Sequence, residues 1–206
     1  MIAIIEDIKA TYRNDPACRN IEFLLYPGFQ AITVHRFIHL LYNVHIPFIP
    51  RLLSQISRFL TGLEIHPGAS IGPGFFVDHG AGVVIGEPTH IGKNCVLFHN
   101  VTLGGTGKHQ GKRHPTLGDN VFIGTQATLL GPITVGDNVK IGANSFIVMN
   151  DVPSNCTVTG TPARIIKQDG IRCDKELPRT VIEPNQHNST KYAEKIIPIK
   201  EKNINL

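Results

Sequence analysis

The chain has 206 residues, of which 41% are hydrophobic, and this is enough for one sizeable folded core. Its formal net charge of +4 comes from dispersed basic residues that form no Arg-rich patch, so nucleic-acid binding is not indicated. The content of 20 glycines and 14 prolines, without tryptophan, favours β structure with many turns.

The cysteines and the most apolar segments exclude several other classes of protein. The four cysteines are scattered and form no C-x-x-C pair, so neither a zinc site nor a disulfide framework is predicted. The first ten residues place acidic side chains among isoleucines and do not resemble a signal peptide. Residues 29–42 are the most apolar stretch, but they contain His35, Arg36 and His39 and are too short to span a bilayer. We therefore expect a cytoplasmic protein without a membrane span.

Residues 1–60 are predicted to form a small helical domain. Helix-like apolar spacing occurs before Asn14, over residues 28–43 and over residues 50–61, and prolines interrupt it between these segments. This domain could cap one end of the structure that follows and contribute to a substrate site.

Residues 61–168 carry an internal repeat of six residues. An aliphatic residue occupies every sixth position at Leu117, Ile123, Leu129, Val135, Ile141 and Ile147. The same period runs earlier through Ile65, Ile71 and Val77, and after a shift of two residues through Ile85, Ile91, Leu97 and Leu103. This period predicts a mainly β protein, a parallel β-helix with three short strands in each coil of about 18 residues and the aliphatic column pointing inward. Residues 169–206 lose the period, and we expect a polar, mobile tail there.

Two insertions interrupt the repeat and concentrate its polar residues. The first adds two residues near positions 78–84, and the second forms the longer loop 104–116. Insertions in a solenoid become surface loops, where binding residues are often found.

His79 in the first insertion is a candidate general base, because a neutral imidazole can accept a proton from a hydroxyl group. Glu64 lies 15 residues earlier, a little short of one coil, so its carboxylate could orient the His79 ring. The alternative is that both are polar corner residues without a chemical role. His99 stands one coil after His79, could stack on it, and is interpreted as structural.

Arg113 and His114 in the second insertion could reach a substrate carboxylate, for which the planar guanidinium of arginine is well suited. A solvated basic loop is the alternative. Glycines at positions 104, 105, 107 and 111 would let the backbone approach a ligand closely.

These motifs together resemble the serine O-acetyltransferase family. The resemblance is carried by D-H-G-A-G from Asp78, V-T-L-G-G-T-G-K from Val101 and R-H-P from Arg113. D-P-A from Asp15, I-H-P-G-A from Ile65 and G-T-P-A-R-I-I from Gly160 extend it over about residues 13–167.

The resemblance implies a left-handed parallel β-helix of hexapeptide repeats and a homotrimer with active sites between adjacent subunits. It also implies acetyl transfer from acetyl-CoA to the hydroxyl of L-serine, the first step of cysteine biosynthesis, without a metal. In this sequence His79 would be the base and Glu64 its orienting carboxylate. Serine would be bound by Asp15, Asp78, Arg113 and His114. Coenzyme A would be held near Gly105, Thr106, Thr125, Ala143 and Arg164.

Two features depart from the family pattern, and a third bears on a partner. Many members have aspartate at the position of Glu64, and the helical part is short compared with long members, which leaves a hexamer in doubt. Some members insert a C-terminal isoleucine into O-acetylserine sulfhydrylase, and the resemblance implies that the end of this chain, Asn203 to Leu206 with Ile204, could bind the same partner.

Three rival functions remain open from the sequence. A hexapeptide O-acetyltransferase could act on a sugar hydroxyl, since the coil and the coenzyme site would serve it equally. A γ-type carbonic anhydrase would need zinc on three histidines, for which His79, His109 and His114 are the candidates. The coil could also be a non-catalytic trimeric scaffold.

Overall fold

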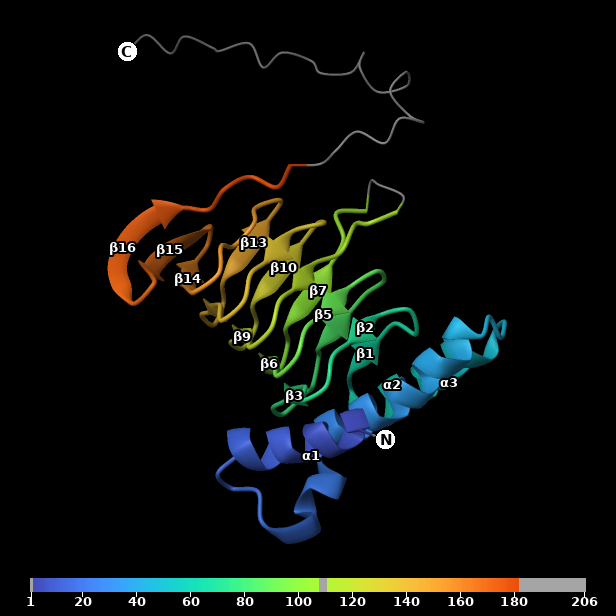
Figure 1. The fold of residues 1–206 in the computed structure, drawn as a ribbon. Coiled ribbons are helices and arrows are strands. Elements are labelled where there is room, and N and C mark those ends of the chain that lie inside the picture. Colours follow the sequence, from blue (N-terminus) through green and yellow to red (C-terminus); the bar gives the residue numbers. More distant parts are fainter. Residues whose placement is uncertain (1, 108–110, 182–206) are drawn as a thin grey trace, which may run out of the picture.

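The computed structural model describes residues 2–107 and 111–181. A three-sided β-solenoid forms the body of the molecule, with helices across one end and a curved antiparallel extension at the other (Figure 1). In the described parts of the chain, no helix is both long and apolar enough to cross a membrane.

The helical part contains α1 (Ile2–Asn14), α2 (Pro27–Asn43) and α3 (Ile49–Thr61), which confirms the three predicted helical segments. A short 3-10 helix, η1 (Asn20–Leu25), was not predicted. Prolines stand in the first turns of α2 and α3, where a missing N–H removes no helical hydrogen bond. Gly62 ends α3 with a φ of 76°, a left-handed conformation that glycine adopts without strain.

The solenoid has three sheets; each of the first four coils gives one strand to each sheet, and the fifth gives strands to the first and third. The first sheet contains β1 (Glu64–Ile65), β4 (Val84–Ile85), β7 (Thr102–Gly104), β10 (Thr128–Leu130) and β13 (Phe146–Val148). The second contains β2 (Ser70–Ile71), β5 (His90–Ile91), β8 (Thr116–Leu117) and β11 (Thr134–Val135). The third contains β3 (Phe76–Val77), β6 (Val96–Leu97), β9 (Phe122–Ile123) and β12 (Lys140–Ile141), followed by β14 (Cys156–Gly160). All these strands pair in parallel, so the predicted parallel β-helix is confirmed.

The predicted aliphatic column forms the core. Every residue of the column is buried except Ile71, which is partly exposed in the first coil. A second inward column lies two residues before the first, from Leu63 and Ala69 to Val139 and Ser145. The sequence analysis missed this second column because Thr89, Cys95 and Ser145 interrupt its aliphatic character.

Asparagines form a ladder along the corner between the second and third sheets. Asn94, Asn120, Asn138 and Asn155 each have a φ between 55° and 60°. Each side-chain amide donates to the next one, at 3.4, 3.1 and 3.0 Å. Asparagine tolerates the left-handed conformation better than other non-glycine residues, so it can turn the chain and also link successive coils.

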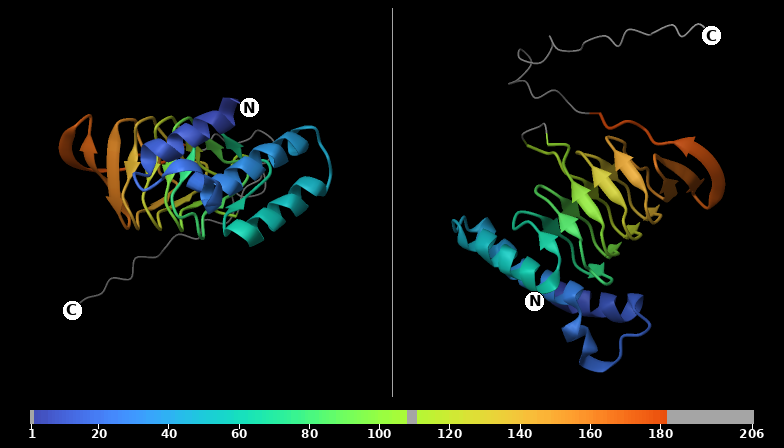
Figure 2. Two further views of the ribbon diagram at one scale, coloured as in Figure 1. Left: turned by 90° about the horizontal axis from the view of Figure 1, so that it is seen from below. Right: turned by 180° about the vertical axis from the view of Figure 1, so that it is seen from behind.

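Helices α1 and α2 close the first coil, as Figure 2 shows from below. Asp7 of α1 pairs with Arg36 of α2 at 2.6 Å and accepts hydrogen bonds from the N–H groups of Gly74 and Phe75. Arg36 donates to the carbonyls of Ile71 and Gly72. Polar backbone groups at the open end of the coil are therefore satisfied by side chains of the helices.

The C-terminal part differs from the expected mobile tail. Strand β15 (Ala163–Gln168) turns back on β14, and β16 (Ile171–Glu176) pairs antiparallel with β15. The six-residue period ends here because these strands no longer wind around the coil. The free edge of β15 still presents backbone N–H and C=O groups, and β16 forms hydrogen bonds with them. Residues 182–206 lie outside the described residues.

Candidate active site

The corner between the third and first sheets carries the candidate base. We call it the histidine corner; it comprises residues 78–83, 98–101, 124–127 and 142–145 in successive coils. His79 lies in the inserted turn with a φ of 60°, and its side chain is 73% exposed. Its ring meets that of His99 edge to face, with 5.8 Å between the ring centroids and an interplanar angle of 75°. The predicted neighbouring position of these two histidines is confirmed.

One carboxylate lies beside His79, and a second lies within the electrostatic range of its ring. Asp78 Oδ2 lies 3.8 Å from His79 Nε2. Asp15 follows α1, and a hydrogen bond from Tyr26 holds the pKa of its carboxyl below the usual range, with a smaller contribution from the charge of His79. Asp15 is therefore ionised at neutral pH, and the charge of His79 is near enough to contribute to the lowered pKa of its carboxyl.

Glu64 opens β1, and its carboxylate is directed to α3. Its partners are Arg58 Nε at 3.3 Å and Arg51 Nη2 at 4.0 Å. The expected contact with His79 is not formed in the described structure, where the nearest carboxylate to the His79 ring is that of Asp78.

The candidates of the longer insertion lie on a different corner. We call it the loop corner, between the first and second sheets; among the described residues it comprises 66–69, 86–89, 105–107, 111–115 and 131–133. His114 is buried against Gly86, where an added Cβ would stand 2.3 Å from His114 Nε2. Burial lowers the pKa of His114, and the neighbouring charges of Arg113 and Lys112 lower it further, so the ring is neutral at pH 7.

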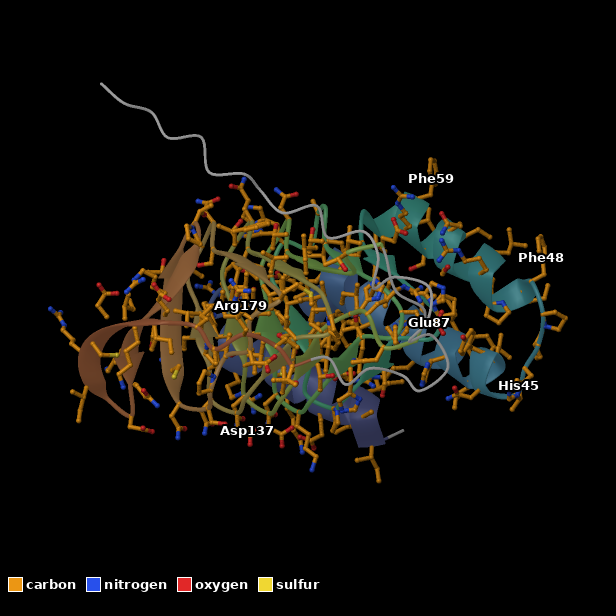
Figure 3. All side chains as sticks on the ribbon, turned by 90° about the horizontal axis from the view of Figure 1, so that it is seen from above. His45, Phe48, Phe59, Glu87, Asp137 and Arg179 are labelled. Atoms are coloured by element: carbon orange, nitrogen blue, oxygen red, sulfur yellow. The ribbon has the colours of Figure 1, made fainter. Side chains whose placement is uncertain are left out.

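A polar cluster beside His114 was missed in the sequence. Glu87 accepts a hydrogen bond from the Tyr42 hydroxyl, and its Oε2 lies 3.4 Å from His66 Nδ1. Figure 3 shows Glu87 where the coil meets the helices. Tyr42 belongs to α2 and is 45 residues from Glu87, so no local pattern could have linked the two.

The candidates for coenzyme binding are divided between the two corners. Thr125 and Ala143 lie on the histidine corner, whereas Gly105 and Thr106 lie on the loop corner. Arg164 on β15 is held by Asp174 Oδ1 at 2.6 Å and Glu176 Oε1 at 3.5 Å.

The first sheet separates the two groups of candidates within one chain. Asp78 and His79 lie at the corner that precedes the strands of the first sheet, on the side where Asp15 also lies. Arg113 and His114 lie at the corner that follows these strands. Among the described residues, no hydrogen bond or ion pair joins the two groups, and no three His, Cys, Asp or Glu residues are arranged to hold a metal. His109, named above as a zinc candidate, lies outside the described residues.

Known proteins match both the repeat and most of the chain. The family described as "Bacterial transferase hexapeptide (six repeats)" matches residues 114–148. A serine acetyltransferase of Synechococcus elongatus is 56% identical over 170 residues, which cover 82% of this chain and 69% of that protein. The chain belongs to the serine acetyltransferase family. As a member of the serine acetyltransferases it is an acyltransferase, which decides against the carbonic anhydrase and scaffold interpretations.

Solved serine acetyltransferases share the fold. The Neisseria gonorrhoeae serine acetyltransferase in complex with serine has a TM-score of 0.77 and 41% identity, covering 80% of this chain and 68% of that one. The Brucella abortus serine acetyltransferase in complex with coenzyme A has a TM-score of 0.78 and 42% identity, covering 82% and 68%.

Proposed function

We propose that this chain transfers the acetyl group of acetyl-CoA to the hydroxyl of L-serine, giving O-acetyl-L-serine and free CoA. The observation that carries the proposal is an exposed imidazole beside the carboxylate of Asp78, on the same solenoid as an Arg-His pair. The serine and coenzyme A complexes of the related structures support the two substrates.

His79 is the proposed general base. It removes the proton of the serine hydroxyl as the oxygen attacks the thioester carbon, and the C–S bond breaks as the tetrahedral intermediate collapses. The imidazolium then returns the proton to the departing CoA sulfur. Asp78 stabilises the imidazolium from 3.8 Å. Glu64 could take the orienting role assigned to it from the sequence only after its carboxylate leaves Arg58.

The charged ends of serine determine where it binds. Its ammonium group fits between Asp15 and Asp78, and its carboxylate fits the guanidinium of Arg113 with the neutral ring of His114 beside it. Holding both ends directs the hydroxyl at the thioester, and such positioning accounts for a large part of an enzyme's rate.

A complete site needs two copies of the chain. Serine is too small to reach both corners at the two ends of the first-sheet strands. In the proposed site, the loop corner of one subunit therefore meets the histidine corner of its neighbour. We propose a homotrimer with a site at each interface. Coenzyme A would lie along Thr125, Ala143 and Arg164 of one subunit, with Gly105 and Thr106 from the neighbour. Assembly into a hexamer and binding of a sulfhydrylase by the C-terminus stay predictions, and the latter falls on residues outside those described.

The test is the release of CoA thiol from acetyl-CoA with and without L-serine. We expect serine-dependent release that His79→Ala lowers by about 10²- to 10⁴-fold in kcat, the usual contribution of a general base. Release that sugars support and serine does not would favour the alternative acceptor, a sugar hydroxyl.

A further inference from the structure

We infer that His99 is a positioning residue that fixes the ring of His79, a role that rests on the function proposed above. His99 lies in a regular hexad rather than in an insertion, and the sequence alone favoured a structural role for it. Three observations at the histidine corner indicate more than that.

The first observation is that His79 has little else to hold it. Its side chain is 73% exposed, Asp78 Oδ2 lies 3.8 Å from its ring, Asp15 lies within electrostatic range, and His99 makes the ring contact. An exposed side chain exchanges among its rotamers, and a ring packed against it restricts that exchange. The edge-to-face contact at 5.8 Å comes from His99, one coil above.

The second observation is that His99 is itself held. Its Nε2 lies 2.7 Å from Thr125 Oγ1, and the same hydroxyl lies 3.1 Å from the His99 carbonyl oxygen. The hydroxyl has one proton, so when it donates to the carbonyl the His99 ring must donate from Nε2. The Thr125 backbone is also a proposed coenzyme contact, so this bond joins the base to the coil that would hold CoA.

The third observation is the state of the other ring nitrogen. His99 Nδ1 is buried and finds no hydrogen-bond partner in the described structure. Leaving a buried polar atom without a partner costs stability, so a ring selected only for packing would be better replaced by an apolar one. A histidine nevertheless occupies the position between the proposed base and the coils that would hold the coenzyme.

The test compares two replacements that each preserve one contact. His99→Phe keeps a ring against His79 and loses the bond to Thr125, whereas His99→Gln keeps a polar group that can reach Thr125 and loses the ring. If the ring positions His79, we expect His99→Gln to lower kcat by about tenfold and His99→Phe by less than about threefold, with both KM values within about twofold of the parent. His45→Asn is the control, since His45 lies between α2 and α3 at the outer end of the helices (Figure 3) and asparagine tolerates its φ of 60°.

Each other outcome overturns the inference. If His99→Gln keeps full activity and His99→Phe loses it, the bond to Thr125 matters and the ring contact does not. A rise in KM for acetyl-CoA with unchanged kcat would place His99 in coenzyme binding. Thermal unfolding of both variants must match the parent, and a loss of kcat that only follows a loss of folded protein also counts against the role. Failure of the parent protein to acetylate serine would refute the proposed function instead, and the two failures are thereby distinguished.

Discussion

Asp7 is the residue on which the junction of helices and coil depends. Its side chain is 2% exposed, and its carboxylate is bound by Arg36 and by two backbone N–H groups of the first coil. A buried carboxylate with this many donors is fully compensated, but an amide in its place keeps one acceptor oxygen, puts an NH2 donor against Arg36 Nε and removes the charge that balances the guanidinium.

We predict that Asp7→Asn destabilises the protein by about 3–5 kcal/mol, because Arg36 is left as an uncompensated buried charge. The free energy of unfolding in urea measures the effect. Glu6→Gln is the matched control on the same helix: it breaks the exposed pair of Glu6 with Lys9, and we expect a loss of less than about 1 kcal/mol. Equal losses for the two variants would contradict the role of Asp7.

His35, at the junction of helices and coil, makes the stability of the fold depend on pH. Its Nε2 bonds to the Ala69 carbonyl, and burial, with smaller effects of His39 and Arg36, lowers the pKa of His35 to about 3. Below pH 6.5 the unfolded chain binds a proton at this residue while the folded chain does not, so stability falls as the pH falls from 6.5 toward 3.

Between pH 6.5 and pH 5 we predict that the parent protein loses about 2 kcal/mol more of its free energy of unfolding than the His35→Gln variant does. Glutamine can still donate to the Ala69 carbonyl but does not titrate. Urea unfolding of both proteins at several pH values measures the difference, and parallel pH curves would show that His35 does not carry it.

At the scale of the element, each corner of the solenoid must turn the chain sharply and must also hydrogen-bond to the next coil. The asparagine ladder does both, because the residue type that accepts a positive φ also carries an amide that can donate and accept. The hexad is therefore more than an aliphatic period: it specifies a turn residue at the same place in every coil.

We predict that Asn138→Ala destabilises the coil by about 1–3 kcal/mol, since alanine loses both amide hydrogen bonds and is strained at a φ of 59°. Asn138→Gly removes the same bonds without the strain and should cost less. Thermal unfolding of the two variants separates the two contributions; a larger loss for glycine would mean that strain is unimportant at this corner.

At the scale of the whole molecule, the candidate groups stand on two corners of one rigid coil. The strands of the first sheet lie between Arg113 and His79 in one chain, and this arrangement is the basis for proposing a site shared between copies.

We predict that mixed assemblies of His79→Ala and Arg113→Ala chains regain activity that neither variant has alone. With random mixing, about a quarter of the interfaces of a trimer pair an intact His79 with an intact Arg113. Co-expression followed by the thiol-release assay measures this. Separately expressed variants mixed without subunit exchange are the control, and an inactive mixed assembly would contradict the shared site.

The sequence by itself determined the repeating part of this protein. The three helices, the aliphatic column from Ile65 to Ile147, the two insertions and the neighbouring positions of His79 and His99 could be predicted from it. These features follow from a local period, since each hexad repeats the same strand and turn, and the coil then brings residues one turn apart into contact.

Only the tertiary structure decided how the site residues are distributed. It placed Arg113 on a different corner from His79, directed Glu64 to the arginines of α3, and brought Tyr42 to Glu87. These contacts depend on the angle at which helices meet the coil and on which side of a strand each residue faces, and neither is encoded in a period. Such contacts join residues far apart in the chain, so they exist only once the helices have packed on the coil.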